Sequence, residues 1–411
     1  MAMESEFAPQ WYLCRWRWLV IAIFVAMGIV ACDKKDDSTI KVGILHSMSG
    51  TMAFSERDLV DVLTMAIEEI NGSGGVLGRQ LEPVLADGAS NWWQFSKEAE
   101  RLIVQERVSV LFGCWTSSSR IAVKPIVERY DHLLFYPLQY EGLEQSSNII
   151  YTGATPNQQI IPGVHWALEN IGKSVYLLGS DYIFPRAANM LIKDQLKNRG
   201  IEPLGERYLS LGSSDISGAI EDIRRLKPDL VFNTINGDSN IAFFNALDGL
   251  KETKVVSFSI AEPEVSAIGI EHMLGHYAVW NYFQSIESPE NRQFVSAFKA
   301  RFGEDRVVND PMEATYIGIK LWVQGVVAAG TFDPLRVKHA LGYQSLNAPQ
   351  GIVSVDMGSQ HVWKTVRIGR VRSDGQFEIV WRSDSPIRPT PFPKYHSRSI
   401  WLQRLQELKY R

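Results

Sequence analysis

The chain has 411 residues, of which 45% are hydrophobic and 21% charged, with a formal net charge of -4 at pH 7. This length and apolar content are sufficient for two α/β lobes, each with its own core. The slightly acidic balance argues against nucleic-acid binding, which needs a basic face, so we expect no nucleic-acid partner.

The first residues are typical of an export signal. Two arginines precede an apolar run that ends at Cys32 and is shorter than the roughly 20 residues of a membrane-spanning helix. The residues Ile-Val-Ala-Cys resemble a bacterial lipobox, so we predict a signal peptide over 1–31 and lipidation of Cys32. The alternatives are an uncleaved anchor helix or an ordinary signal. Residues 32–39 would then be a charged, flexible tether on a periplasmic, membrane-anchored lipoprotein.

Strand-like apolar runs alternate with helical patterns through the next part of the chain. Strands are predicted at 40–45, 81–85, 108–112 and 133–135, and helices at 59–70, 95–105 and 121–130. This alternation predicts a parallel sheet with helices on both faces. The Gly-rich run 71–78 ends the first helix and lacks the spacing of a dinucleotide-binding loop, so we interpret it as a helix end and turn.

The alternation restarts after residue 153. Helices are predicted at 160–171, 187–198, 216–226 and 239–250, and strands at 174–178, 229–233 and 254–259. An aromatic strand at 278–283 then crosses back to the first lobe. Helices at 291–302 and 315–329 follow there, and the region 351–381 is expected to be antiparallel, with a hairpin around Ser373-Asp374-Gly375.

The predicted fold class is therefore α/β, with two parallel-sheet lobes joined by several strands as a hinged clamshell. We assign residues 40–157 and 284–345 to lobe 1 and residues 158–283 and 346–390 to lobe 2. The C-terminal tail, 391–411, has no role that its sequence indicates.

The segment 108–142 carries the densest polar chemistry, at the ends of two adjacent predicted strands. Its candidate binding side chains are Trp115, Thr116, Ser117, Tyr136, Gln139 and Tyr140. They offer hydroxyls, a helix N-terminus, an amide and two phenols to one crevice. Because ligands of open α/β sheets bind at the carboxyl ends of strands, we predict the ligand site here.

Polar groups also follow three strands of the second predicted lobe, with Tyr182, Asp238 and Glu262 among them. Any one of these loops could simply cap a helix, but three in succession favour a cleft that faces the first lobe. Acceptor carboxylates with aromatic walls suit a neutral ligand rich in N–H groups, such as urea or a short amide. An amino acid, with its carboxylate on the helix start at 117–119, is the alternative.

Enzymatic motifs are weak. Cys114 has no base marked beside it, and an inert thiol at a strand end is the better interpretation. His272 and His276 are four residues apart but lack the Glu of a zinc-protease motif. We therefore predict no catalytic residues, no metal and no cofactor, and a protein that is not an enzyme.

Ten motifs, spread from Ile40 to Trp381, carry a family resemblance, and FGCWTSSSR, LLFYPLQYEG, GSDYIFPRAAN, FNTINGDSNIAFF and SFSIAEPE are among them. The chain resembles the substrate-binding proteins of ABC transporters for urea and short-chain amides, within the leucine/isoleucine/valine-type class of periplasmic binding proteins. The resemblance implies a type I, Venus flytrap fold that captures urea between its lobes and delivers it to an ABC permease.

The resemblance also implies which side chains contact the ligand. These are Ser117, Tyr136, Gln139, Tyr182, Phe184 and Asp238, with Glu262 as a less certain addition. Pro263 departs from the urea branch, where another acidic residue is common, and this leaves the orientation of Glu262 open. The alternative function is a binding protein or sensor for short-chain aliphatic amides, or for amino acids. The predicted signal and Cys32 argue against a cytoplasmic sensor.

Overall fold

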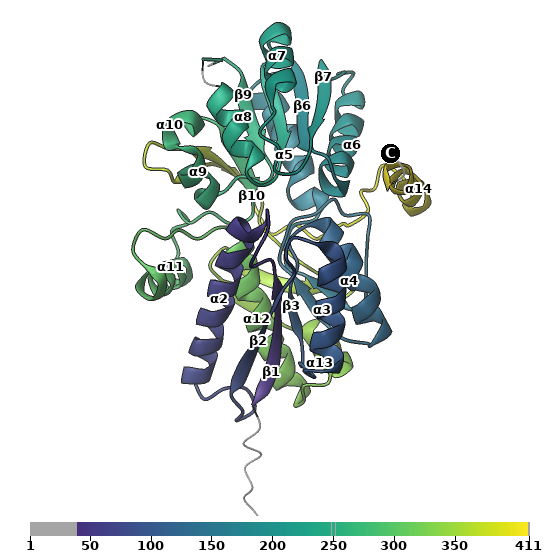
Figure 1. Cartoon of the computed structure of the whole chain (residues 1–411), viewed down its shortest axis with the longest axis vertical. Coiled ribbons are helices and arrows are strands. Elements are labelled where there is room, and N and C mark those ends of the chain that lie inside the picture. Colours follow the sequence, from purple (N-terminus) through teal and green to yellow (C-terminus); the bar gives the residue numbers. More distant parts are fainter. Residues whose placement is uncertain (1–38, 248, 251, 410–411) are drawn as a thin grey trace, which may run out of the picture. The chain divides into compact units, whose positions relative to one another are not determined.

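Two β-sheets, each with helices packed against it, organise the compact part of the chain, which begins at Ile40 (Figure 1). The computed structural model describes residues 39–247, 249–250 and 252–409. The strands of the first sheet are β1 (Ile40–His46), β2 (Leu81–Asp87), β3 (Leu111–Gly113), β4 (Leu134–Tyr136), β5 (Ile149–Tyr151), β11 (Ser345–Ala348), β12 (Gly351–Asp356) and β13 (His361–Val362). They lie in the order β11-β12-β13-β5-β4-β3-β1-β2, and β1 to β5 pair in parallel. We call this sheet with its helices the first lobe.

Buried apolar clusters cover both faces of the first sheet. Its helices are α2 (Ala53–Gly72), α3 (Trp92–Val104), α4 (Ser117–Arg129), α11 (Pro289–Phe302), α12 (Asp310–Ala329) and α13 (Pro334–Leu341). Ile44 and Leu45, successive residues of β1, enter different clusters because neighbouring side chains of a strand point to opposite faces. Helices α3 and α4 contribute to the cluster of Leu45, and α12 and α13 to that of Ile44. This burial on two sides explains the near-continuous apolar runs of the sequence.

The second sheet repeats this architecture. Its strands are β6 (Val175–Ser180), β7 (Gly205–Leu209), β8 (Leu230–Thr234), β9 (Lys254–Ser257), β10 (Tyr277–Trp280), β14 (Arg367–Val371) and β15 (Phe377–Arg382). Its helices are α5 (Ile160–Asn170), α6 (Ile183–Lys197), α7 (Ser217–Leu226), α8 (Ser239–Leu247), α9 (Glu262–Ile268) and α10 (Ile270–Met273). Strands β6 to β10 pair in parallel, and β14 and β15 form an antiparallel hairpin. The α/β fold class and the predicted hairpin are confirmed, and we call this part the second lobe.

The boundary of the second lobe near the C-terminus differs from the prediction, which assigned all of 346–390 to it. Strands β11, β12 and β13 belong to the first sheet, where β13 pairs with β5 through His361 and Tyr151. The buried Val353 and Val355 alternate with less buried residues along β12, and their side chains complete the first-lobe core. After β13, the chain returns to the second sheet at β14.

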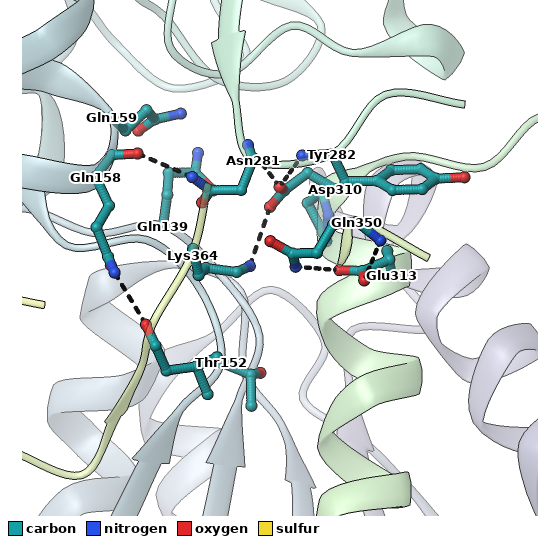
Figure 2. Close-up of polar contacts among 12 residues, drawn as sticks. Gln139, Thr152, Gln158, Gln159, Asn281, Tyr282, Asp310, Glu313, Gln350 and Lys364 are labelled. Carbon is teal, nitrogen blue, oxygen red and sulfur yellow. Dashed lines mark hydrogen bonds and ion pairs between the residues drawn. The ribbon is translucent and has the colours of Figure 1, made fainter. Parts of the chain in front are cut away.

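Polar side chains form hydrogen bonds that hold together the segments crossing between the lobes (Figure 2). Asp310, the first residue of α12, accepts hydrogen bonds at Oδ2 from the backbone N–H groups of Asn281 and Tyr282, each at 2.9 Å. Asn281 Nδ2 donates in turn to the backbone oxygen of Gln158, at 3.0 Å. The crossing segments near 158 and 281 are therefore tied to each other and to a first-lobe helix.

The C-terminal tail packs onto the second lobe. Its helix α14 (Arg398–Lys409) buries Trp401 in the second-lobe core, and Arg404 bonds to Asp194 of α6. The tail is thus part of the packing of this lobe, a role that its sequence had not indicated.

Among the residues that the structure describes, none of the helices combines the length and the apolarity needed to cross a bilayer. The predicted signal peptide (1–31) and Cys32 lie outside the described residues.

Candidate functional site

A cavity of about 40 Å³ lies where the carboxyl ends of strands from both sheets meet. The polar side chains of its first-lobe wall are Ser47, Glu56, Ser90, Thr116, Ser118 and Ser119. They follow or pack beside the ends of β1, β2 and β3. Tyr182 and Leu211, which follow β6 and β7, form the second-lobe wall. This position agrees with the general rule for ligand sites in α/β sheets.

The N-terminus of α4 supplies unpaired donors to this wall. Thr116 has an extended backbone, and its Oγ1 accepts from the N–H of Ser119 at 3.1 Å, which starts the helix. Among the described residues, the N–H groups of Ser117 and Ser118 have no hydrogen-bond acceptor. Free N–H groups at a helix start carry partial positive charge and suit a carbonyl or anionic oxygen.

A tight loop after β1 forms the next part of the wall. Ser90 Oγ accepts from the N–H of Met52 at 3.0 Å and donates to the backbone oxygen of Ser49 at 2.9 Å. The backbone approach is so close that a Cβ on Gly50, which has φ +82°, would lie 2.6 Å from Ser90 Oγ. Glycine is therefore required at this position to bring the loop against Ser90.

Glu56 presents a buried carboxylate to the cavity. The residue is 1% exposed, and its Oε2 accepts from the N–H of Ser47 at 2.8 Å. The same oxygen lies 3.1 Å from Nδ1 of His46, which is also fully buried. These two contacts fix the carboxylate on α2 against the end of β1.

A buried ionic network lies beside the cavity, centred on Arg120. Its guanidinium bonds to Glu144 Oε1 and to Glu141 Oε1, each at 2.9 Å, and stacks over the rings of Tyr136 and Tyr140. Burial opposes ionisation of Glu144, but Arg120 and Lys124 outweigh it and lower the pKa of that carboxyl. Two carboxylates therefore balance the charge of Arg120, which leaves no net positive charge for a ligand.

Two of the predicted site residues contact this network, Ser117 through its hydroxyl and Tyr136 through its ring. Ser117 Oγ donates to Glu141 Oε2 at 2.5 Å and accepts from Arg120 at 3.2 Å. Tyr136 donates to the backbone oxygen of Trp115 at 2.8 Å. Both hydroxyls make their hydrogen bonds within the first lobe. Among the described residues, the group of Ser117 that has no partner is its backbone N–H.

The other predicted residues divide between the cavity, the lobe interface and the cores. Thr116 and Tyr182 line the cavity. Burial, with contributions from Tyr136 and Glu141, raises the pKa of the Tyr182 hydroxyl well above its usual value, and Arg120 offsets only part of this shift. Trp115 and Tyr140 lie in the first-lobe core and Phe184 in the second. The structure does not bring these three side chains to the cavity wall.

Gln139, Asp238 and Glu262 lie at other places between the lobes. Gln139 Nε2 donates to the backbone oxygen of Phe258 in the second lobe, at 3.0 Å. Asp238 is exposed and lines a separate, smaller cavity of about 10 Å³ with Ser55 of the first lobe. Glu262 is fully buried beside the crossing segments, and burial raises its pKa to about 8.

Three residues that line the cavity, Ser47, Glu56 and Ser90, were not among those predicted from the sequence. One signal was present for Glu56: it precedes Leu59 by one helical turn, on the face of α2 that the apolar pattern predicts to be buried. A carboxylate on such a face is rare without a partner or a function.

Cys114 is unsuited to nucleophilic chemistry. Burial raises the pKa of its thiol, and Glu56 adds to the shift, so the reactive thiolate is disfavoured. Among the described residues, no group of three or more metal-ligating side chains is close enough to hold a metal ion.

Comparisons with known proteins agree with the two-lobed α/β fold. A family model described as a periplasmic binding protein domain matches residues 40–398. A Leu/Ile/Val-binding protein homolog 6 from Brucella melitensis biotype 1 is 24% identical over 363 residues, which span 84% of this chain and 91% of that protein. A solute-binding protein of an ABC transporter from R. palustris, solved with 4-hydroxybenzoate, shares the fold with a TM-score of 0.76 and 24% identity, over 85% of this chain and 98% of that one.

A shorter match covers only part of the chain. A limonene hydroxylase from Geobacillus stearothermophilus is 37% identical over 124 residues, but these are 30% of this chain and 23% of that protein. The chain thus spans less than a quarter of this relative.

Proposed function

Because this chain belongs to the periplasmic binding protein domain family, as a solute-binding protein of the ABC-transporter type, we propose that it captures urea between its lobes and delivers it to an ABC permease. Binding and delivery need no chemical step. The observation that carries the choice of ligand is the small, cation-free cavity at the strand ends.

The size of the cavity supports a very small ligand. A cavity needs roughly 10–15 Å³ to hold one water molecule. A cavity of about 40 Å³ therefore holds a ligand of only a few non-hydrogen atoms. Urea, formamide and acetamide are of this size. Drug-sized ligands occupy pockets of about 300–1,000 Å³, and a hydroxybenzoate is too large for this cavity.

The charge of the wall supports a neutral ligand. None of the described residues that line the cavity is Lys or Arg, and Glu56 contributes a carboxylate. A ligand carboxylate would usually need a cation, and the nearby Arg120 is already paired with Glu141 and Glu144. Urea instead offers one carbonyl oxygen for the N–H groups of α4 and four N–H donors for the acceptors of the wall.

Five of the site residues named in the sequence analysis take part in this proposal. Thr116 and Tyr182 contact the ligand directly, and the backbone N–H of Ser117 donates to it. Gln139 supports the site through its bond between the lobes. Asp238 and Ser55 close the neighbouring cavity when the lobes meet.

Thermal unfolding of the purified protein with urea, formamide, acetamide, leucine and 4-hydroxybenzoate tests the ligand. A ligand at about 100 times its dissociation constant adds roughly 2.7 kcal/mol to the free energy of unfolding, which raises the melting temperature measurably. We expect a rise with urea. A rise with the other amides alone would favour the second candidate, an amide-binding protein. A rise only with leucine or 4-hydroxybenzoate would overturn the proposal.

We also propose that Cys32 is lipidated and anchors the protein outside the cytoplasm. The observation in support is the sequence around Cys32. Mass spectrometry of the wild-type protein should show the added mass of acyl chains on Cys32, and a Cys32→Ala variant should lack it. Absence of this mass from the wild type would contradict lipid anchoring.

A further inference from the structure

Glu56 has one carboxylate oxygen in use and one without a partner. Oε2 accepts from Ser47 and lies beside His46 Nδ1, whereas Oε1 makes no hydrogen bond to any described residue. The residue is 1% exposed and lines the inter-lobe cavity. A carboxylate oxygen without a protein donor is free to accept a hydrogen bond, so a donor from a molecule in the cavity would bind to it.

The surroundings of Glu56 offer it no ion pair with a strong cation. No Lys or Arg lines the cavity in the described part of the chain, and the nearest basic group is His46, held on the other oxygen. The carboxylate is also fixed in place, because its two contacts come from the end of β1. A fixed acceptor costs little further ordering when a ligand arrives.

Across the same cavity, the first turn of α4 offers groups of the opposite kind. The N–H and the hydroxyl of Ser118 can donate to a ligand oxygen, whereas the hydroxyl of Ser119 already donates to the backbone oxygen of Thr116 at 2.8 Å. Tyr182 of the second lobe covers the cavity from the other side. A ligand with a carbonyl oxygen at one end and an N–H group at the other would satisfy both walls.

We propose that Glu56 accepts a hydrogen bond from a ligand N–H group and thereby selects amides over carboxylates of the same shape. The inference rests on the proposed function, since it names the partner of the ligand nitrogen. A carboxylate ligand would instead place its own negative charge beside Glu56, without a cation to offset it.

A purely structural role for Glu56 is the competing explanation, because the residue also holds the N–H of Ser47. Acetamide and acetate separate the two explanations, since they have nearly the same shape and differ in N–H donors and charge. If Glu56 only shapes the loop, its substitution should weaken both ligands to the same extent. If Glu56 accepts a hydrogen bond from the ligand nitrogen, the ratio of the acetamide and acetate affinities should change.

The experiment is calorimetric titration of wild type, Glu56→Gln and a control, Glu68→Gln, with urea, acetamide and acetate. Gln keeps an oxygen for Ser47 but loses the charge. We expect Glu56→Gln to bind urea and acetamide at least tenfold more weakly and to shift the acetamide-to-acetate affinity ratio at least tenfold toward acetate. Glu68, on the same helix, pairs with Arg301 at the surface, and its variant should behave as wild type.

The outcomes distinguish the two proposals. If the wild-type protein binds neither urea nor any amide, both the proposed function and the inference about Glu56 are wrong. If wild type binds urea and Glu56→Gln keeps the same affinity ratio, only the inference about Glu56 falls. Should this variant fail to fold, a crystal structure of the wild-type complex with urea decides: we expect a urea nitrogen within about 3.2 Å of Glu56 Oε1, and a longer distance would overturn the inference.

Discussion

The Nζ atom of Lys364 lies 4.0 Å from Oδ1 of Asp310, and both side chains are fully buried (Figure 2). This distance exceeds that of a hydrogen bond, and neither atom has another partner among the described residues. Oε1 of Gln350, whose amide end points toward the same region in Figure 2, also lacks a donor. Ordered water that bridges these atoms would satisfy them, as water commonly does for buried polar groups. A buried ion pair therefore lies beside the segments that cross between the lobes.

Lys364→Met should lower the free energy of unfolding by about 3 kcal/mol. Removal of one partner of a buried pair leaves the other charge uncompensated, here on Asp310. Thermal unfolding is the suitable measurement, because urea as a denaturant would also be the proposed ligand. Lys197→Met, at an exposed position near the end of α6, should stay within about 0.5 kcal/mol of wild type. Equal stability of both variants would contradict an energetic role for the pair.

Glu262 should make the protein less stable as the pH rises. Its pKa is raised from 4.5 to about 8 in the folded state, chiefly by burial, so the folded protein keeps a proton that the unfolded chain releases. Stability from this group is complete below about pH 4.5, is lost as the pH rises toward 8, and is constant above that. Glu262→Gln should remove this loss, which is on the order of a few kcal/mol.

Melting temperatures at about pH 5, 6.5 and 8 measure this effect. Glu313 and Glu264, whose pKa values burial raises to about 7, have the same sign, so the Gln variant retains part of the dependence. Parallel curves for wild type and Glu262→Gln would show that Glu262 does not titrate in this range.

Much of the fold could be predicted because its signals are local. Buried parallel strands produce apolar runs in the sequence, and the helices that pack on them produce an amphipathic period. Such patterns are present in the segments of β1, β6 and α12. The lobe to which β12 and β13 belong could not be predicted. Their alternation marks them as strands, but which sheet they join depends on the contact of Val353 and Val355 with a core built from distant residues.

The candidate site was predictable in position and less so in its side chains. The rule for strand ends located the cleft and brought Thr116 and Tyr182 to it. The same rule could not tell which hydroxyls are already paired, because the partner of Ser117 is Glu141, on the next strand end. Glu56 was not predicted as a site residue, because its position depends on a contact with the backbone of Ser47 and not on a motif.

Arg120→Lys should destabilise the first lobe although the charge is kept. The guanidinium bonds to Glu141, Glu144 and Ser117 at once, through three different nitrogens. A lysine ammonium cannot reproduce this planar arrangement and leaves at least one buried acceptor unpaired, at a cost of about 1–3 kcal/mol. Thermal unfolding should show the loss, and Arg129→Lys, at an exposed position on the same helix, is the matched control. A stability equal to that of the control would contradict the assigned network.

Trp401→Ala should destabilise the second lobe without a change in ligand affinity. The indole is fully buried, its Nε1 donates to the backbone oxygen of Pro393 at 2.8 Å, and truncation of a buried Trp costs about 3–5 kcal/mol. Leu402→Ala, one residue further along α14 and 40% exposed, should cost far less. Thermal unfolding and calorimetric titration with urea measure the two effects. Weaker urea binding by the folded Trp401→Ala protein would mean that the tail acts on the cleft, whereas unchanged stability would mean that α14 is not docked in solution.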